Sequence, residues 1–87
     1  MSQKYLKWVR QQPCSYTLSP GPNDAHHIIG IGHFGGMGLK APDILSMPLC
    51  RAKHREMHEN PDLWPDQWEF VVRTLLKAFK EGVIVES

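Results

Sequence analysis

The sequence predicts a small α+β domain in which two short strands and a helix are flanked by a further helix on each side. A β-compatible segment, 25–29, runs into a glycine-rich loop, and a second apolar segment, 44–49, follows that loop. Good helix formers then fill residues 50–60, and an amphipathic pattern of helical spacing covers residues 65–81. The 87 residues suffice for a single domain, 1–87.

The first helix is expected to begin at Ser2 and to end before Pro13, because apolar residues repeat at helical spacing between them. The proline- and glycine-rich segment 19–24 predicts a turn region. Five glycines among residues 30–38 exclude a packed element there, so this segment is a loop between the strands. Pro48 indicates that the second strand lies at an edge or ends nearby.

The last two helices have clear sequence boundaries. Asn60 and Pro61 end the first of them, Pro65 fits the first turn of the next, and Gly82 closes it. The apolar face of the final helix is expected to be buried and to anchor the domain, with Trp64 and Trp68 in the core. This face comprises Trp68, Val71, Val72, Leu75, Leu76 and Phe79.

Charge and composition limit the function classes. Residues 1–58 carry seven Lys and Arg against three Asp and Glu, whereas residues 59–87 carry three against six. The basic half also holds all five histidines, which is the asymmetry expected if that half meets phosphate. Two cysteines and no recognisable leader predict a cytosolic protein, and no apolar run is long enough to span a membrane.

Four of the histidines form a pattern typical of a metal site. His54 and His58 are four residues apart on an expected helix, so they lie on one face within reach of one ion. His26 and His27 are adjacent on an expected strand, so their side chains diverge and only one can join that ion. Any one of these histidines alone would more often be an ordinary core or surface residue, but their joint pattern favours one divalent ion with open coordination positions.

The motifs around these histidines resemble the HNH family of nucleases, also called ββα-metal or His-Me finger nucleases. The resemblance covers roughly residues 13–58 and is strongest to a phage and prophage subgroup that includes the RecA-dependent Ref nuclease. The motifs are PCSYT (13–17), DAHHIIG (24–30), GGMGLKAPD (35–43) and MPLCRAKHREMH (47–58). The resemblance implies a ββα-metal core and the hydrolysis of DNA phosphodiester bonds in phage or prophage recombination.

The resemblance also implies residue roles. His26, His54 and His58 would hold one divalent ion, of which Mg²⁺, Mn²⁺ and Zn²⁺ are candidates, and His27 would be the general base that activates water. Asp43 stands near the position of the family's central Asn, which holds the loop that orients the base. An aspartate there keeps an acceptor and loses the amide donor, and Asp43 as a simple turn or cap residue is an equally good alternative.

One part of the family pattern is incomplete. Relatives often hold a structural zinc through a CxxC pair before the first strand and a further pair at the start of the metal-binding helix. Here Cys14 and Cys50 stand at the first position of each pair, while Thr17 and Lys53 occupy the second. Two ligands cannot form a closed tetrahedral site, so we expect no structural zinc. Small buried hydrophobes are the favoured role for both cysteines, with a disulfide as the alternative.

The basic residues are candidate contacts for DNA phosphates, with solvated side chains as the alternative. His33, in the glycine-rich loop, is expected to be solvated. A recombinase filament or another targeting protein is a possible partner, and the rival function is a catalytically inactive DNA-binding or recombinase-accessory module. The candidate contacts are Lys40, Arg51, Lys53 and Arg55 near the histidines and Lys4, Lys7 and Arg10 on the first helix.

Overall fold

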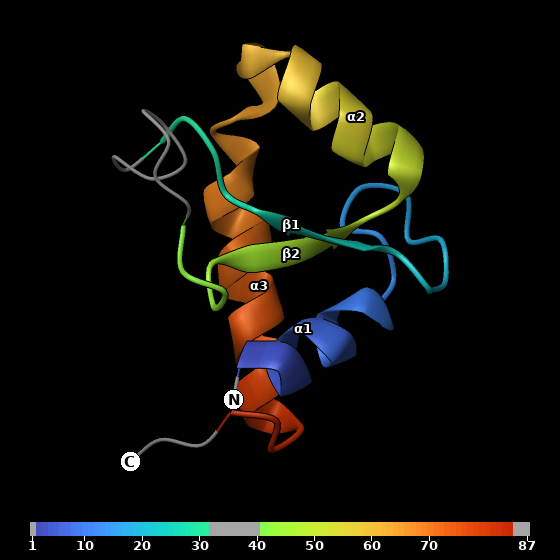
Figure 1. Cartoon of the computed structure of the whole chain (residues 1–87), viewed down its shortest axis with the longest axis vertical. Helices are drawn as coiled ribbons and strands as arrows, with labels where there is room; N and C mark the ends of the chain where they lie inside the picture. The colour runs from blue at the N-terminus through green and yellow to red at the C-terminus, as the bar shows by residue number, and fades with distance from the viewer. Residues whose placement is uncertain (1, 32–40, 85–87) are drawn as a thin grey trace.

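The computed structural model describes residues 2–31 and 41–84 and contains helices, a small sheet and a short 3₁₀ turn (Figure 1). The predicted α+β class and the order of the elements are confirmed. Each boundary lies within three residues of its prediction, as expected for element ends. The elements are α1 (Ser2–Arg10), β1 (Asp24–His27), β2 (Ser46–Leu49), α2 (Arg51–Glu59), η1 (Pro61–Leu63) and α3 (Asp66–Lys80).

The two strands form an antiparallel sheet whose register places His26 opposite Met47 and His27 opposite Ser46. Both strands are shorter than predicted, although the Ile28 amide still donates to the Leu45 carbonyl at 3.0 Å beyond the ladder. Beyond Ile28 the backbone of Ile29 bonds to the Gln67 side chain instead, and Gly30 follows with φ at +69°. Because α2 follows β2 after one residue, β1, β2 and α2 form a continuous ββα unit.

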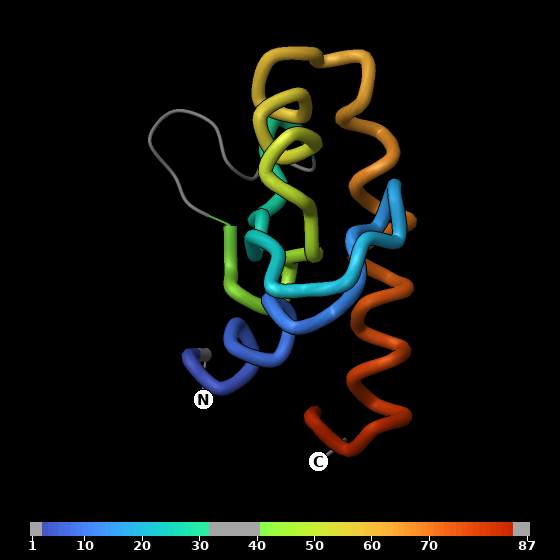
Figure 2. Tube along the Cα trace, turned by 90° about the vertical axis from the view of Figure 1, so that its right-hand side faces the viewer, coloured from blue at the N-terminus to red at the C-terminus, as the bar shows by residue number. Residues whose placement is uncertain are grey.

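The helices surround this hairpin on different sides. In both views α2 lies above the strands and α1 below them, while α3 runs along the whole assembly (Figures 1 and 2). The main core, between the hairpin, α2 and α3, includes Met47, Leu49, Met57, Phe70 and Val71. A smaller cluster joins Tyr5 and Val9 of α1 to Ala78 of α3. The long helix thus connects both ends of the domain, as expected of an anchor.

The face that α3 buries differs in part from the predicted one. The buried residues lie on one side of the helix and are Gln67, Phe70, Val71, Thr74 and Ala78. Within the predicted face, Val71 is buried and Leu75 is partly buried, as expected, but the expectation is wrong for the four remaining residues, which are exposed. The exposed fractions are 41% for Trp68, 50% for Val72, 64% for Leu76 and 47% for Phe79. Phe70 and Val71 on this inner face fill the main core, while the small Ala78 lies in the cluster with α1.

Trp64 ties the end of α2 to the segment that follows β1. Its indole nitrogen donates to the Met57 carbonyl at 2.8 Å, and its ring packs over Gly30. A Cβ added at Gly30 would lie 2.1 Å from Cζ3 of that ring, so this close approach needs glycine as much as the positive φ does. None of the described helices is both long and apolar enough to span a membrane.

Candidate metal centre

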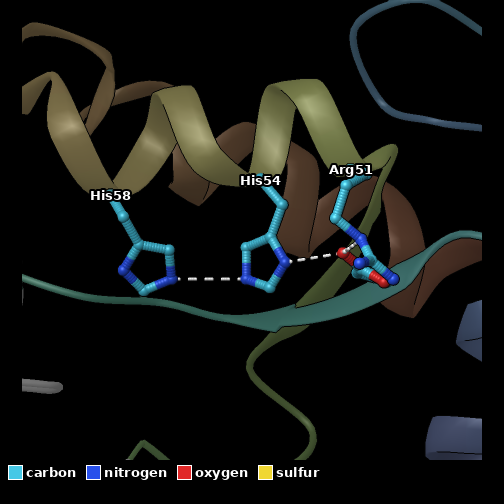
Figure 3. A network of polar contacts seen from close by, with 4 residues as sticks. Arg51, His54 and His58 are labelled. Carbon is cyan, nitrogen blue, oxygen red and sulfur yellow. Dashed lines mark hydrogen bonds and ion pairs between the residues drawn. The ribbon is translucent and has the colours of Figure 1, made fainter.

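Three histidines from two elements of the ββα unit come together. His26 lies on β1, whereas His54 and His58 lie one turn apart on α2. Their ring centroids are 5.0 to 5.2 Å apart. One ring nitrogen from each histidine lies within 4.8 Å of the others, and among the described residues this triad is the one such group that could hold a metal ion. Figure 3 shows His54 and His58 pointing from the helix toward the strand beneath it.

The geometry and protonation of the triad fit a metal ion. The Nε2 atoms of His54 and His58 are 3.3 Å apart. That spacing is long for a hydrogen bond, but two nitrogens bound to a tetrahedral zinc at about 2.0–2.1 Å would lie about 3.3 Å apart. Burial lowers the pKa of His26 to about 4 and, with the His54 charge, lowers the pKa of His58. The neutral forms of His26 and His58 are therefore favoured, and three nitrogen donors suit Zn²⁺ or another transition ion better than Mg²⁺.

Asp24 orients one of these candidate ligands and was not predicted from the sequence. Its Oδ2 accepts a hydrogen bond from Nδ1 of His54 at 2.9 Å and lies 3.3 Å from Nε of Arg51. The hydrogen bond from His54 and the charge of Arg51 lower the pKa of Asp24 despite its partial burial. With Nδ1 of His54 occupied, its Nε2 is directed at His58 (Figure 3). Asp24 lies two residues before His26 on β1, a spacing that could have identified it as a same-face neighbour.

Gln67 is the second missed neighbour, and it comes from α3. Its Oε1 lies 2.9 Å from Nε2 of His26, and both side chains are buried. No local sequence motif predicts this contact, because the two partners are 41 positions apart in the sequence. The one sequence feature that could have indicated a buried role for Gln67 is that its amide shares a helix face with the apolar Val71 and Ala78.

His27 contacts a different partner from His26, as expected for neighbours on a strand. Its Nε2 lies 2.7 Å from Oδ1 of Asp43, and the two side chains are 18% and 25% exposed. Ser46 Oγ donates to the Asp43 carbonyl at 2.6 Å and so anchors that residue beside β2. A carboxylate only accepts, so Asp43 favours the form of His27 that carries hydrogen on Nε2. The neutral ring then has its lone pair on Nδ1, which leaves this nitrogen able to accept a proton.

The incomplete zinc pattern forms no four-residue ligand cluster among the described residues. Cys14 is buried in the main core, as predicted, while Cys50 is half-buried and packs against it; both are free thiols. Burial raises the pKa of Cys14, but hydrogen bonds from Thr17 and from nearby backbone amides outweigh it and lower the value to about 7. Thr17 also bonds Ser19, and Lys53 pairs with Glu56 at 3.0 Å.

The candidate DNA contacts fall into two groups rather than one surface. Arg51 and Arg55 are exposed on the helix that carries the histidines, and Lys53 lies beside the Tyr16 ring. The exposed basic residues of α1 lie on the other side of the hairpin (Figure 1). These are Lys4, Lys7 and Arg10. Lys40 and His33 lie outside the described residues.

Comparison with known proteins places the chain in a family. It is 40% identical over 88 residues to the uncharacterized protein YdfU of Escherichia coli (strain K12). That alignment covers 97% of this chain and 25% of the relative, so the chain spans about a quarter of that protein's length. No solved structure matches significantly. A family model described as protein of unknown function, DUF968, matches residues 1–84, and the chain therefore belongs to the DUF968 family.

Proposed function

We propose that this domain is a metal-dependent endonuclease of the HNH type that hydrolyses DNA phosphodiester bonds. The proposal rests on one observation: β1 places a candidate metal site and a candidate general base next to each other. His26 faces the α2 histidines in a cluster suited to one ion, and its neighbour His27 pairs separately with Asp43. A metal centre beside an oriented, partly exposed imidazole supplies the two functions that phosphodiester hydrolysis needs. The chain's ββα unit fits the core of that fold class.

In the proposed reaction the residues of the chain have separate tasks. His27 takes a proton from the attacking water through Nδ1, while Asp43 holds the ring and stabilises the imidazolium that forms. A divalent ion held by His26, His54 and His58 would stabilise the charge that develops on the phosphate and the leaving oxygen. Asp24 and Gln67 keep two of those imidazoles in place.

DNA is the proposed substrate because exposed cations flank the histidines. Arg51 and Arg55 lie on the same helix as two ligands and could contact phosphates on either side of the scissile bond. No described element presents a set of side chains typical of base readout, so we expect weak, backbone-directed binding. A partner or a further domain would then select the target.

Nicking of supercoiled plasmid, with and without Zn²⁺, Mn²⁺ or Mg²⁺, tests the proposal directly. We expect metal-dependent nicking that His27→Ala reduces by about 10²–10⁴-fold with little change in metal affinity. His58→Ala should instead weaken metal binding. DNA binding without nicking under any of these metals would support the rival reading, a catalytically inactive DNA-binding or recombinase-accessory module.

A salt series on the His27→Ala protein tests the expected DNA contacts. Each neutralised duplex phosphate adds about −0.9 to the slope of log affinity against log salt. Because the two basic groups lie on opposite sides of the hairpin, Arg51→Ala with Arg55→Ala should make that slope less steep. Lys4→Ala with Lys7→Ala should change it little. Equal effects of the two pairs, or strong preference for one duplex sequence, would contradict this assignment.

A further inference from the structure

We propose that Gln67 is a positioning residue that fixes His26 as the tautomer protonated on Nε2, so that Nδ1 is the free nitrogen of that ring. The tautomer follows from hydrogen bonds within the chain. Only the identification of Nδ1 as the metal-binding atom rests on the proposed function. Gln67 belongs to α3, outside the ββα unit that holds the three histidines.

The orientation of the Gln67 amide is fixed by backbone groups. Ile29 N donates to Oε1 at 3.0 Å, and Nε2 donates to the carbonyls of Ile29 and Trp64 at 2.9 and 3.0 Å. Rotating the amide by 180° would place its NH₂ against the Ile29 amide and its oxygen against two carbonyl oxygens. Every one of these groups would then lose its partner in a buried environment, which is unfavourable. Oε1 therefore faces His26.

The amide oxygen determines which nitrogen of His26 is protonated. Since Oε1 can only accept, the 2.9 Å contact requires His26 to donate from Nε2. In the neutral ring the second nitrogen, Nδ1, then carries the lone pair. His54 has the opposite assignment, because the Asp24 carboxylate occupies its Nδ1 and leaves Nε2 free. Asp24 of β1 and Gln67 of α3 thus favour opposite tautomers in the two rings of the cluster that they contact.

Long-range ¹H–¹⁵N correlation spectra of the metal-free whole chain report the tautomer directly. We expect His26 to carry its hydrogen on Nε2, and zinc titration to perturb its Nδ1 most strongly. Gln67→Met removes the acceptor, so we expect mixed tautomers of His26 and zinc affinity weakened by about 10–100-fold. Thr74→Val is the matched control, because it also removes a buried polar group from the same face of α3 without contacting His26.

The possible outcomes distinguish the role of Gln67 from the proposed metal-binding function. A wild-type His26 protonated on Nδ1 would overturn the inference whether or not Gln67→Met folds. Zinc binding through Nε2, or a Thr74→Val protein that shows the same mixture of tautomers, would also overturn it. If zinc does not bind at all while His26 keeps hydrogen on Nε2, the role of Gln67 stands and the proposed metal function fails.

The outer face of α3 carries a second, independent inference: we infer that it is the contact surface of an antiparallel dimer with another copy of this chain. The outer stripe, defined as Trp68, Val72, Leu76 and Phe79, is between 41% and 64% exposed. Figure 2 shows α3 running along one side of the molecule, with no described element beyond it. An apolar stripe of this length on a surface helix is typical of a contact site.

The charges of α3 favour a second copy in antiparallel orientation. The first turn of the helix carries Asp66 and Glu69, and the last turn carries Lys77 and Lys80. Asp66 accepts a hydrogen bond from Tyr16 and Glu69 pairs with Arg73 of the same helix, and both carboxylates keep a negative charge at this end of α3. In an antiparallel pair the acidic end of each helix lies beside the basic end of its partner, whereas a parallel pair would bring like charges together. The surface is therefore complementary to itself, as a twofold interface requires.

Sedimentation equilibrium of the whole chain tests the dimer. Leu76→Glu should weaken self-association by about 100-fold or more, because an unpaired carboxylate would be buried. Ile44→Glu is the matched control at an exposed apolar residue elsewhere. Glu69→Lys should weaken the dimer, and adding Lys80→Glu should restore it. A monomer at all concentrations, or a dimer insensitive to Leu76→Glu, would overturn this inference.

Discussion

Replacing Asp24 should weaken metal binding without touching a ligand. The carboxylate accepts from Nδ1 of His54 at 2.9 Å and contacts Arg51 at 3.3 Å. Loss of a group that orients a metal-bound histidine typically costs 10–100-fold in affinity, or about 1.4–2.7 kcal/mol. Arg51 is 85% exposed, so its contact with Asp24 contributes at most about 1 kcal/mol and reaches no ligand directly. The His54 contact should therefore account for most of the loss.

Three variants separate these contributions in zinc titrations by calorimetry at constant pH. Asp24→Leu removes the acceptor and should reach the upper part of that range. Asp24→Asn keeps an oxygen that can accept from His54 and should lose tenfold or less. Arg51→Gln should bind zinc nearly as the wild type does. Wild-type affinity in Asp24→Leu, or an equal loss in Arg51→Gln, would refute the orienting role of Asp24.

Three further results are expected. The metal-free chain should lose stability as the pH falls from about 6.5 to about 4, because the unfolded chain binds a proton on His26 more strongly than the folded chain does; urea unfolding across this window should show a shallower pH dependence for His26→Gln. Gly82→Ala, with φ +75° and open space around it, should cost about 1–2 kcal/mol, whereas Gly30→Ala must also displace Trp64 and should cost about 1–3 kcal/mol more in the same assay. Elemental analysis should find at most one tightly bound metal per chain, and a second metal that is lost on replacing Cys14 and Cys50 by Ser would contradict the expected absence of a structural zinc.

Local patterns predicted the element order and the gathering of the histidines, because both depend on short spacings. The HxxxH spacing places His54 and His58 on one helix face, and the structure brings His26 beside them. The end of β1 was less accurate because the backbone N–H and carbonyl of Ile29 bond to the Gln67 side chain rather than to β2. The contact between His27 and Asp43, which the sequence did not predict, also lies within one hairpin.

The inner face of α3 could not be predicted in the same way. Hydrophobicity alone favours the side with Trp68 and Leu76, since these residues are larger and more apolar than Thr74 and Ala78. Burial follows the space available: Phe70 and Val71 of α3 fill the main core, whereas the small Ala78 faces α1. Choosing the wrong face also hid Gln67, whose contact with His26 depends on how α3 is docked.

The position of Trp64 makes its intrinsic fluorescence a probe of the conformation of the domain. Its ring rests on Gly30 just beyond β1, and its indole N–H is bonded to the Met57 carbonyl within α2. The fluorescence of an indole depends on its packing and hydrogen bonding. Movement of β1 relative to α2, the two elements that carry the histidines, should therefore change the wavelength and intensity of its emission. Replacing Trp8 and Trp68 by Phe would leave Trp64 as the one tryptophan, which can be excited selectively over the two tyrosines. Opening and closing of the histidine cluster could then be followed by light alone, without attaching a dye.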